Sequence, residues 1–122
     1  MGIDFKRINH IHITVPVERL EEARKFYTDI IGLKLITRPD GVFDAPGYWF
    51  ALTDIELHIG VEPAMPSSIR HYAFEVDDIV SARKHLQDNG VEVKEEPVIP
   101  GRARFSFFDP FGNRVELLQF DL

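Results

Sequence analysis

Hydrophobic and polar residues alternate between Ile8 and Val15. Because successive side chains of a strand point to opposite faces, the aliphatic residues share one face, and His10 and His12 share the other. From Glu18 to Ile31 the apolar residues recur at helical spacing instead, and Gly32 follows where such a helix would end. The pattern predicts a strand with a polar, histidine-bearing face, followed by an amphipathic helix.

The rest of the chain contains the same kinds of element in the same order. Three short strands are predicted at residues 33–37, 47–53 and 54–61. A linker at 62–68, with two prolines and two serines, then leads to a strand at 70–76, a helix from Asp77 or Asp78 to Asn89, and strands at 91–95, 103–109 and 113–120. Each half of the chain therefore reads as strand, helix and three strands.

The two halves also match residue by residue. His71 follows His10 by 61 residues, and Glu116 follows Glu56 by 60. Spacings this even over a whole half are typical of an internal repeat. We therefore predict a single α+β domain, residues 1–122, made of two tandem βαβββ modules at about 3–62 and 69–122. Their sheets are expected to form a cupped, mostly antiparallel surface with the two helices outside.

Composition narrows the class of protein. At 122 residues the chain is sized for one core, and its net charge of −6 argues against a generally basic nucleic-acid-binding surface. The chain has no cysteine, which excludes disulfides, thiolate zinc sites and a cysteine nucleophile. No apolar run approaches the roughly 18 residues of a membrane span, and no signal peptide is indicated, so we expect a cytoplasmic protein with no membrane partner. The charged runs at 18–25 and 94–96 are typical of solvated faces.

Four ionisable residues fall on equivalent positions of the two predicted modules. Glu56 and Glu116 alternate with aliphatic residues on the last strand of each module. His10 and His71 lie on the first strands, and all four are expected on the face away from the helices. Any one of them alone would be read as an ordinary hydrogen-bonded surface residue. Together, two imidazoles and two carboxylates suit a divalent metal such as zinc, nickel, manganese, iron or cobalt, with positions left open for water or a substrate.

Five further residues are candidates for a substrate pocket. His12 and His58 share the polar face but have no histidine counterpart in the second module, which favours a place beside the metal ligands rather than among them. Trp49 lies on a predicted strand, where core packing is the commoner role of an aromatic residue. Arg102 and Arg104 alternate along another strand and could bring a cation to an anionic substrate, although a solvated role is commoner.

Five segments spread over essentially the whole chain carry a family resemblance: INHIHITVP, EEARKFYTDIIGLKL, IELHIG, RHYAFEVDD and FFDPFGNRVELLQ. They resemble the vicinal oxygen chelate superfamily, which includes glyoxalase I, fosfomycin and bleomycin resistance proteins, extradiol dioxygenases and methylmalonyl-CoA epimerase. The resemblance implies metal ligands at the positions of His10, Glu56, His71 and Glu116. Alternation and repetition select the same four residues.

The resemblance also implies a type of chemistry, in which the metal acts as a Lewis acid on a small substrate that binds it through two oxygens. In isomerising members a ligand carboxylate moves a proton beside a carbonyl, so Glu116 is the candidate base and Glu56 the second candidate. In iron dioxygenases the ligands would be two histidines and one carboxylate, with Glu56 not a ligand. The chain is short between Leu35 and Trp49 and in its linker. This argues against glutathione conjugates. The segments PVERLEEARKFY and DPFGNRVELL most resemble a group of small bacterial glyoxalase-like proteins.

Two classes of function remain open at this point. The first is a metal-dependent lyase, isomerase or dioxygenase of the glyoxalase-like kind. The second is a metal-free small-molecule binding protein of the bleomycin-resistance type. The presence of two histidines and two glutamates at repeat positions favours the first class. The family resemblance further implies a homodimer, in which the two modules of one site come from one chain or are exchanged between two chains.

Overall fold

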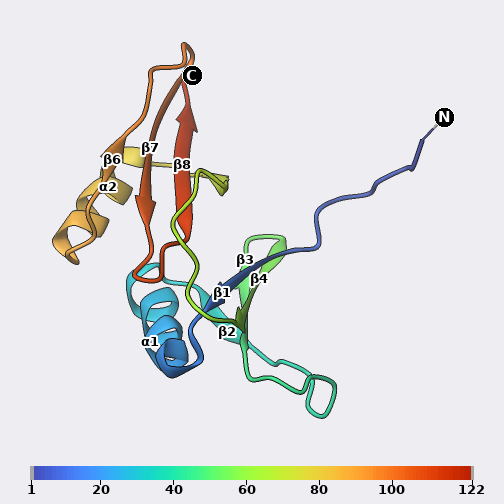
Figure 1. Cartoon of the computed structure of the whole chain (residues 1–122). Helices are drawn as coiled ribbons and strands as arrows, with labels where there is room; N and C mark the ends of the chain where they lie inside the picture. Colours follow the sequence, from blue (N-terminus) through green and yellow to red (C-terminus); the bar gives the residue numbers. More distant parts are fainter. Residues whose placement is uncertain (1, 122) are drawn as a thin grey trace. The chain divides into compact units, whose positions relative to one another are not determined.

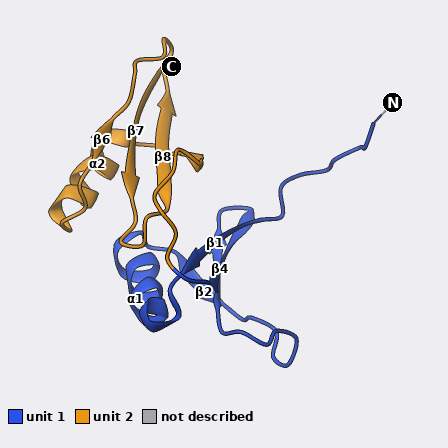
Figure 2. Ribbon diagram, in the orientation of Figure 1, with its two compact units in different colours: residues 1–63 blue, residues 64–122 orange. Residues whose placement is uncertain are grey.

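A computed structural model gives the fold (Figure 1) and describes residues 2–121. The chain divides into two compact units, residues 1–63 and 64–122, which Figure 2 shows in blue and orange. These bounds lie close to the two modules predicted from the repeat. The predicted single domain includes Met1 and Leu122, which lie outside the described residues. That the two units make one domain stays a prediction.

Unit 1 contains one helical stretch and one four-stranded sheet. Its elements are β1 (His10–Val15), η1 (Val17–Arg19), α1 (Leu20–Lys25), η2 (Phe26–Ile30), β2 (Lys34–Ile36), β3 (Tyr48–Leu52) and β4 (Ile55–Val61). The strand order is β1-β4-β3-β2, with β1 parallel to β4 and the other two pairs antiparallel. Every strand predicted in this half is present, shortened by one or two residues at its ends.

The helix predicted at 18–31 is a continuous helical stretch made of η1, α1 and η2. The stretch widens to π-helical geometry in η2, where the backbone N–H of Ile31 donates to the carbonyl of Phe26 over 3.0 Å. The hydroxyl of Thr28 donates to the carbonyl of Arg24, four residues earlier. A hydroxyl in this position competes with the backbone for the same carbonyl, and the regular hydrogen-bond pattern changes at this point.

Unit 2 repeats the arrangement of unit 1. Its elements are β5 (His71–Glu75), α2 (Ile79–Asp88), β6 (Lys94–Glu95), β7 (Arg102–Phe108) and β8 (Arg114–Phe120), and its strand order is β5-β8-β7-β6, with β5 parallel to β8. Asp78, one of the two predicted capping residues, accepts a hydrogen bond from the backbone N–H of Ser81 at 3.0 Å and so begins α2. Gly90, with φ of +77°, follows the helix as predicted. The α+β architecture with two tandem modules is therefore confirmed.

Each sheet buries its apolar face against the helical segment of its own unit. In unit 1, Phe50 and Leu57 are at most 2% exposed, and the ring of Tyr27 from η2 lies 6.2 Å from that of Phe50. In unit 2, Phe105 is fully buried beneath Arg83 of α2, whose guanidinium carbon lies 4.8 Å above the ring. The residues that alternate with this core lie on the opposite face of each sheet, as the sequence pattern predicts.

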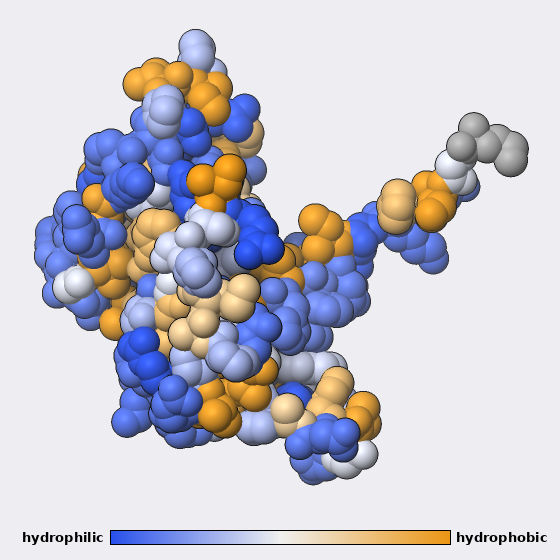
Figure 3. All heavy atoms as spheres, viewed as in Figure 1, coloured by the Kyte–Doolittle hydropathy of each residue, from blue (hydrophilic) through white to orange (hydrophobic). Residues whose placement is uncertain are grey.

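Residues 2–9 precede β1 in unit 1 and contain no helix or strand. Ile3, Phe5 and Ile8 are all at least 67% exposed, and Figure 3 shows orange apolar spheres interspersed with blue polar ones along this segment. None of the helices in residues 2–121 is both long and apolar enough to cross a membrane.

Candidate metal and substrate site

The polar face of the first sheet carries all five site residues predicted in the first module. His10 lies beside Glu56 in the parallel pair β1–β4, and His12 lies beside His58. Trp49 lies opposite His58 in the antiparallel pair β3–β4. Residues paired across two strands share a face. The five side chains line one cavity of about 380 Å³, together with Asn9, Arg38, Phe43, Ile59 and Gly60.

Three rings in this cavity form a stack centred on His58. Its ring centroid lies 4.0 Å from that of His10 and 3.9 Å from that of Trp49, and both contacts are close to parallel. Nε2 of His58 lies 2.8 Å from Oε1 of Glu56, within hydrogen-bond distance. His58 is only 7% exposed, and the stack fixes the ring that lies within hydrogen-bond distance of the Glu56 carboxylate.

The ring of His10 presents its two nitrogens differently. Nδ1 lies 2.9 Å from the amide oxygen of Asn9, which can only accept a hydrogen bond, so Nδ1 carries the proton. In the neutral ring Nε2 would then bear the lone pair, which is the arrangement that metal-ligating histidines have when the other ring nitrogen donates to a neighbouring oxygen.

His12 fits its position because residue 60 has no side chain. A Cβ atom at Gly60 would lie 2.8 Å from Cε1 and Nε2 of the His12 ring, closer than such atoms approach. Partial burial lowers the pKa of His12 below its usual value; electrostatic repulsion from the His58 and His10 rings lowers it further, and Glu62 opposes the shift. The net shift favours the uncharged form of the His12 ring.

The second unit carries the other predicted His–Glu pair. Nδ1 of His71 lies 2.8 Å from the carbonyl oxygen of Ile69, which fixes the proton on Nδ1. Nε2 lies 3.3 Å from Oε1 of Glu116, a residue that is 7% exposed. In the neutral ring the Nε2 lone pair faces a carboxylate oxygen, and a cation held by both groups would stabilise this arrangement. The donor set in each unit thus fits a divalent metal.

Arg104 contacts Glu116 and the loop beside it instead of extending into solvent. Its Nη1 lies 3.3 Å from Oε1 of Glu116, and its Nη2 donates to the carbonyl of Pro97 over 2.8 Å. Arg102 lies on the same face of β7, with its guanidinium carbon 4.6 Å above the ring of Phe120. Both arginines also line a cavity of about 280 Å³ beside the loop that connects β6 and β7.

One sequence expectation in this unit is wrong. Glu96 was expected on a solvated face, but its side chain is only 8% exposed. Its carboxylate accepts hydrogen bonds from Ser106 and from Arg114, which together hold the pKa of Glu96 below its usual value. The partners lie on β7 and β8, and neither is a neighbour of Glu96 in the sequence.

Residues 7–117 match the family model of the Glyoxalase/Bleomycin resistance protein/Dioxygenase superfamily. This chain belongs to that superfamily. The resemblance inferred from the five sequence segments is thereby confirmed.

Three relatives place the chain within the glyoxalase superfamily. The chain is 32% identical to glutathione transferase FosA of Serratia marcescens, over 87% of this chain and 77% of the relative. It is 28% identical to lactoylglutathione lyase of Salmonella typhimurium, over 89% and 90% of the two chains. Among solved structures, a glyoxalase family protein from Bacillus anthracis is 36% identical, covers 99% of this chain and 100% of its own, and superposes with a TM-score of 0.89.

Within the superfamily fold, each unit supplies one half of the predicted ligand set. Among residues 2–121, no three histidine, aspartate or glutamate side chains are grouped so as to hold a metal ion. His10 with Glu56 and His71 with Glu116 are instead two pairs, one on the polar face of each sheet.

Five residues that line the first cavity were not predicted from the sequence, and Arg38 and Phe43 are the two of them that lie in a loop. Arg38 and Phe43 lie in the loop at residues 37–47 between β2 and β3, and both line the cavity that holds the stacked histidines. Because loop residues follow no periodic pattern, nothing in the sequence marked either side chain as facing a cavity.

Proposed function

We propose that this chain is a glyoxalase-like enzyme whose divalent metal is held by His10, Glu56, His71 and Glu116. The observation that carries the proposal is the repeated pair. In each unit a histidine whose Nδ1 is already engaged shares a face with a glutamate, and its Nε2 remains available to a ligand. When bound, zinc, nickel, manganese, iron or cobalt would supply Lewis-acid stabilisation to a small substrate that chelates it through two oxygens.

Glu116 is the proposed base, with Glu56 as the second candidate. Arg104 and His71 both lie 3.3 Å from Oε1 of Glu116, which leaves Oε2 to accept a proton from a carbon beside a carbonyl. Because Glu116 is 7% exposed, little water competes for that oxygen. Glu56 is held through Oε1 by His58 and is more exposed, with 38% of its side chain accessible.

The remaining predicted residues shape the pocket. Trp49, His58 and His12 form the wall of the first cavity. Arg104 orients Glu116, and Arg102 lies beside it on β7. We propose lyase or isomerase chemistry rather than dioxygenase chemistry, because the second carboxylate of the proposed ligand set can act as the general base of a proton transfer.

The test is proton exchange on the metal-reconstituted protein. The assay incubates 2-hydroxyketones, 2-oxoacids and catechols in D₂O, and follows deuterium incorporation by NMR and oxygen uptake by electrode. We expect exchange beside a carbonyl in the wild type, a loss of about 100-fold or more in Glu116→Gln, and no loss in the matched control Glu92→Gln. Oxygen uptake with catechols and no exchange would assign the dioxygenase alternative. Binding of small molecules with neither activity would assign the metal-free binding protein.

The proposal includes a homodimer, the assembly that the family resemblance implies. Sedimentation of the purified chain tests the dimer. Mixing His10→Ala/Glu56→Ala with His71→Ala/Glu116→Ala tests where the ligands of one site come from. If modules are exchanged between chains, mixed dimers regain one intact site and part of the bound metal. If each chain builds its own site, the mixture binds no more metal than either variant alone.

A further inference from the structure

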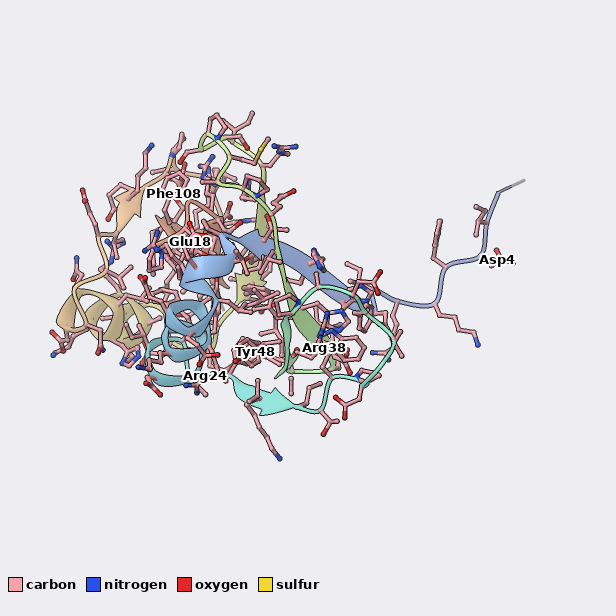
Figure 4. All side chains as sticks on the ribbon, turned by 60° about the horizontal axis from the view of Figure 1, so that its bottom comes forward. Asp4, Glu18, Arg24, Arg38, Tyr48 and Phe108 are labelled. Atoms are coloured by element: carbon pink, nitrogen blue, oxygen red, sulfur yellow. The ribbon has the colours of Figure 1, made fainter. Side chains whose placement is uncertain are left out.

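The loop at residues 37–47 brings a positive charge to the cavity of unit 1. Arg38 lies at the beginning of this loop, and Figure 4 shows its side chain beside the loop and the strands of the first sheet. It lines the cavity of about 380 Å³ that contains His10 and Glu56. It also lines an adjoining cavity of about 590 Å³ under the loop itself. Arg38 therefore lies at the boundary between the candidate metal ligands and the loop.

Two contacts fix the Arg38 guanidinium, and the close approach of the loop to β4 confines it. Its carbon atom lies 4.3 Å above the ring of Phe43, and its Nη2 donates to the carbonyl of Ala45 over 2.9 Å. A Cβ atom at Gly47 would lie 3.2 Å from Nε of Arg38 and 2.4 Å from the carbonyl oxygen of Ile59. The loop therefore passes so close to β4 that only glycine fits, and this packing seats the arginine against the sheet.

The Arg38 guanidinium has no ion-pair partner within the described part of the chain. Asp40 and Asp44 lie in the same loop, yet among residues 2–121 no ion pair joins Arg38 to a carboxylate. Glu56, which lines the same cavity, lies with its Oε1 within hydrogen-bond distance of His58. A half-buried arginine held this way presents free N–H groups in the geometry that carboxylates and phosphates match.

We propose that Arg38 is an anion-binding residue that selects substrates carrying a carboxylate, phosphate or phosphonate group apart from their metal-chelating oxygens. The inference rests on the proposed function only in taking the cavity of unit 1 as part of the substrate site. Phe43 and Ala45 hold the guanidinium in place. Trp49 forms the adjacent wall of the cavity, with its ring centroid 6.1 Å from that of Phe43. The substrate class is then a small acid rather than a neutral carbonyl compound.

The first test needs no metal. Trp49 is the only tryptophan of the chain and lines the same cavity, so its fluorescence reports binding there. Metal-free protein is titrated at constant ionic strength with succinate, which carries only carboxylates, and with methylphosphonate, which carries only a phosphonate. We expect saturable binding of at least one anion in the wild type. In Arg38→Gln its affinity should fall about tenfold or more, because a charge-assisted hydrogen-bond pair is lost.

Two variants keep this test decisive. Arg38→Lys retains the charge and should retain part of the affinity, which separates loss of charge from damage to the loop. Lys34→Gln removes a positive charge from the neighbouring strand β2 outside the cavity and should bind like the wild type. Equal binding by the wild type and Arg38→Gln, or no saturable binding of either anion, would overturn the inference.

The second test uses the metal-loaded protein. Acetohydroxamate chelates a metal without a second anionic group, whereas succinate monohydroxamate and phosphonoacetohydroxamate add one. We expect Arg38→Gln to lower the binding affinity of the two anionic chelators about tenfold and to leave the affinity for acetohydroxamate unchanged. Equal weakening of all three chelators would overturn the inference. If no metal binds to the wild type, the proposed function fails, and the metal-free titration still decides the role of Arg38.

Discussion

The imidazole of His58 lies parallel to the indole of Trp49, with ring centroids 3.9 Å apart and an interplanar angle of 2°. On its other face the same imidazole stacks on His10 at 4.0 Å. The only tryptophan of the chain is therefore one ring away from a candidate metal ligand. This stack connects the pocket wall to the metal centre that we propose. Changes at the pocket wall can therefore be followed by the fluorescence of Trp49.

Replacing His58 with phenylalanine tests whether its hydrogen bond to Glu56 positions that carboxylate. A phenyl ring keeps the stack between His10 and Trp49 but cannot hydrogen-bond to the carboxylate. Outer partners of ligands orient them for the metal, so we expect metal affinity to fall about 10- to 100-fold, measured by competition with a chelator. The control His85→Phe, at an exposed position of α2, should bind metal like the wild type. Unchanged affinity in His58→Phe would show that Glu56 needs no such support.

Gly60→Ala tests the packing under His12. The added Cβ would lie 2.8 Å from the imidazole and must displace it. Overpacking of this kind costs about 1–3 kcal/mol, which urea unfolding would detect. The double variant Gly60→Ala/His12→Ala should be no less stable than His12→Ala alone, because the clash is gone. If Gly60→Ala lowers the free energy of unfolding equally in the wild type and in His12→Ala, the cause would lie in the backbone of β4 and not in the His12 ring.

The buried carboxylate of Glu96 predicts a pH dependence of stability. Ser106 and Arg114 lower its pKa in the folded protein below the usual value of 4.5. The folded state therefore gains stability above that value and loses it as the pH falls through the folded pKa. We expect Glu96→Gln to lower the free energy of unfolding near neutral pH and to approach the wild type in acid. Glu92→Gln, at an exposed position, should follow the wild type throughout.

Local patterns in the sequence were enough to predict the strands and helices. Alternation put Leu57 in the core and Glu56 on the opposite face, and both placements are confirmed. The sequence left Asp77 and Asp78 open as caps of α2, because only the folded chain shows which carboxylate reaches the N–H of Ser81. The alternation of strand side chains between two faces depends only on adjacent residues in the sequence. It can therefore be predicted without knowing the fold.

Contacts between distant residues were beyond the sequence pattern. The partners of Glu96 lie 10 and 18 residues away on other strands, so a run of charged residues gave no sign that one of them is buried. Arg38 lies in a loop, where side-chain direction is set by contacts such as the close approach of Gly47 to Ile59. The repeat, in contrast, marked His10, Glu56, His71 and Glu116 because equivalent positions of two modules carry the same chemistry.

The most direct test of the proposed centre is the metal content of the chain when either half of the ligand set is removed. Elemental analysis would compare reconstituted, tag-free wild type with His10→Ala/Glu56→Ala, with His71→Ala/Glu116→Ala, and with His85→Ala/Glu92→Ala as a matched control. We expect about one metal ion per chain in the wild type and the control, and almost none in either half-site variant, because each module would supply two of four ligands. A wild type that takes up no metal, or half-site variants that each retain it, would contradict a shared centre.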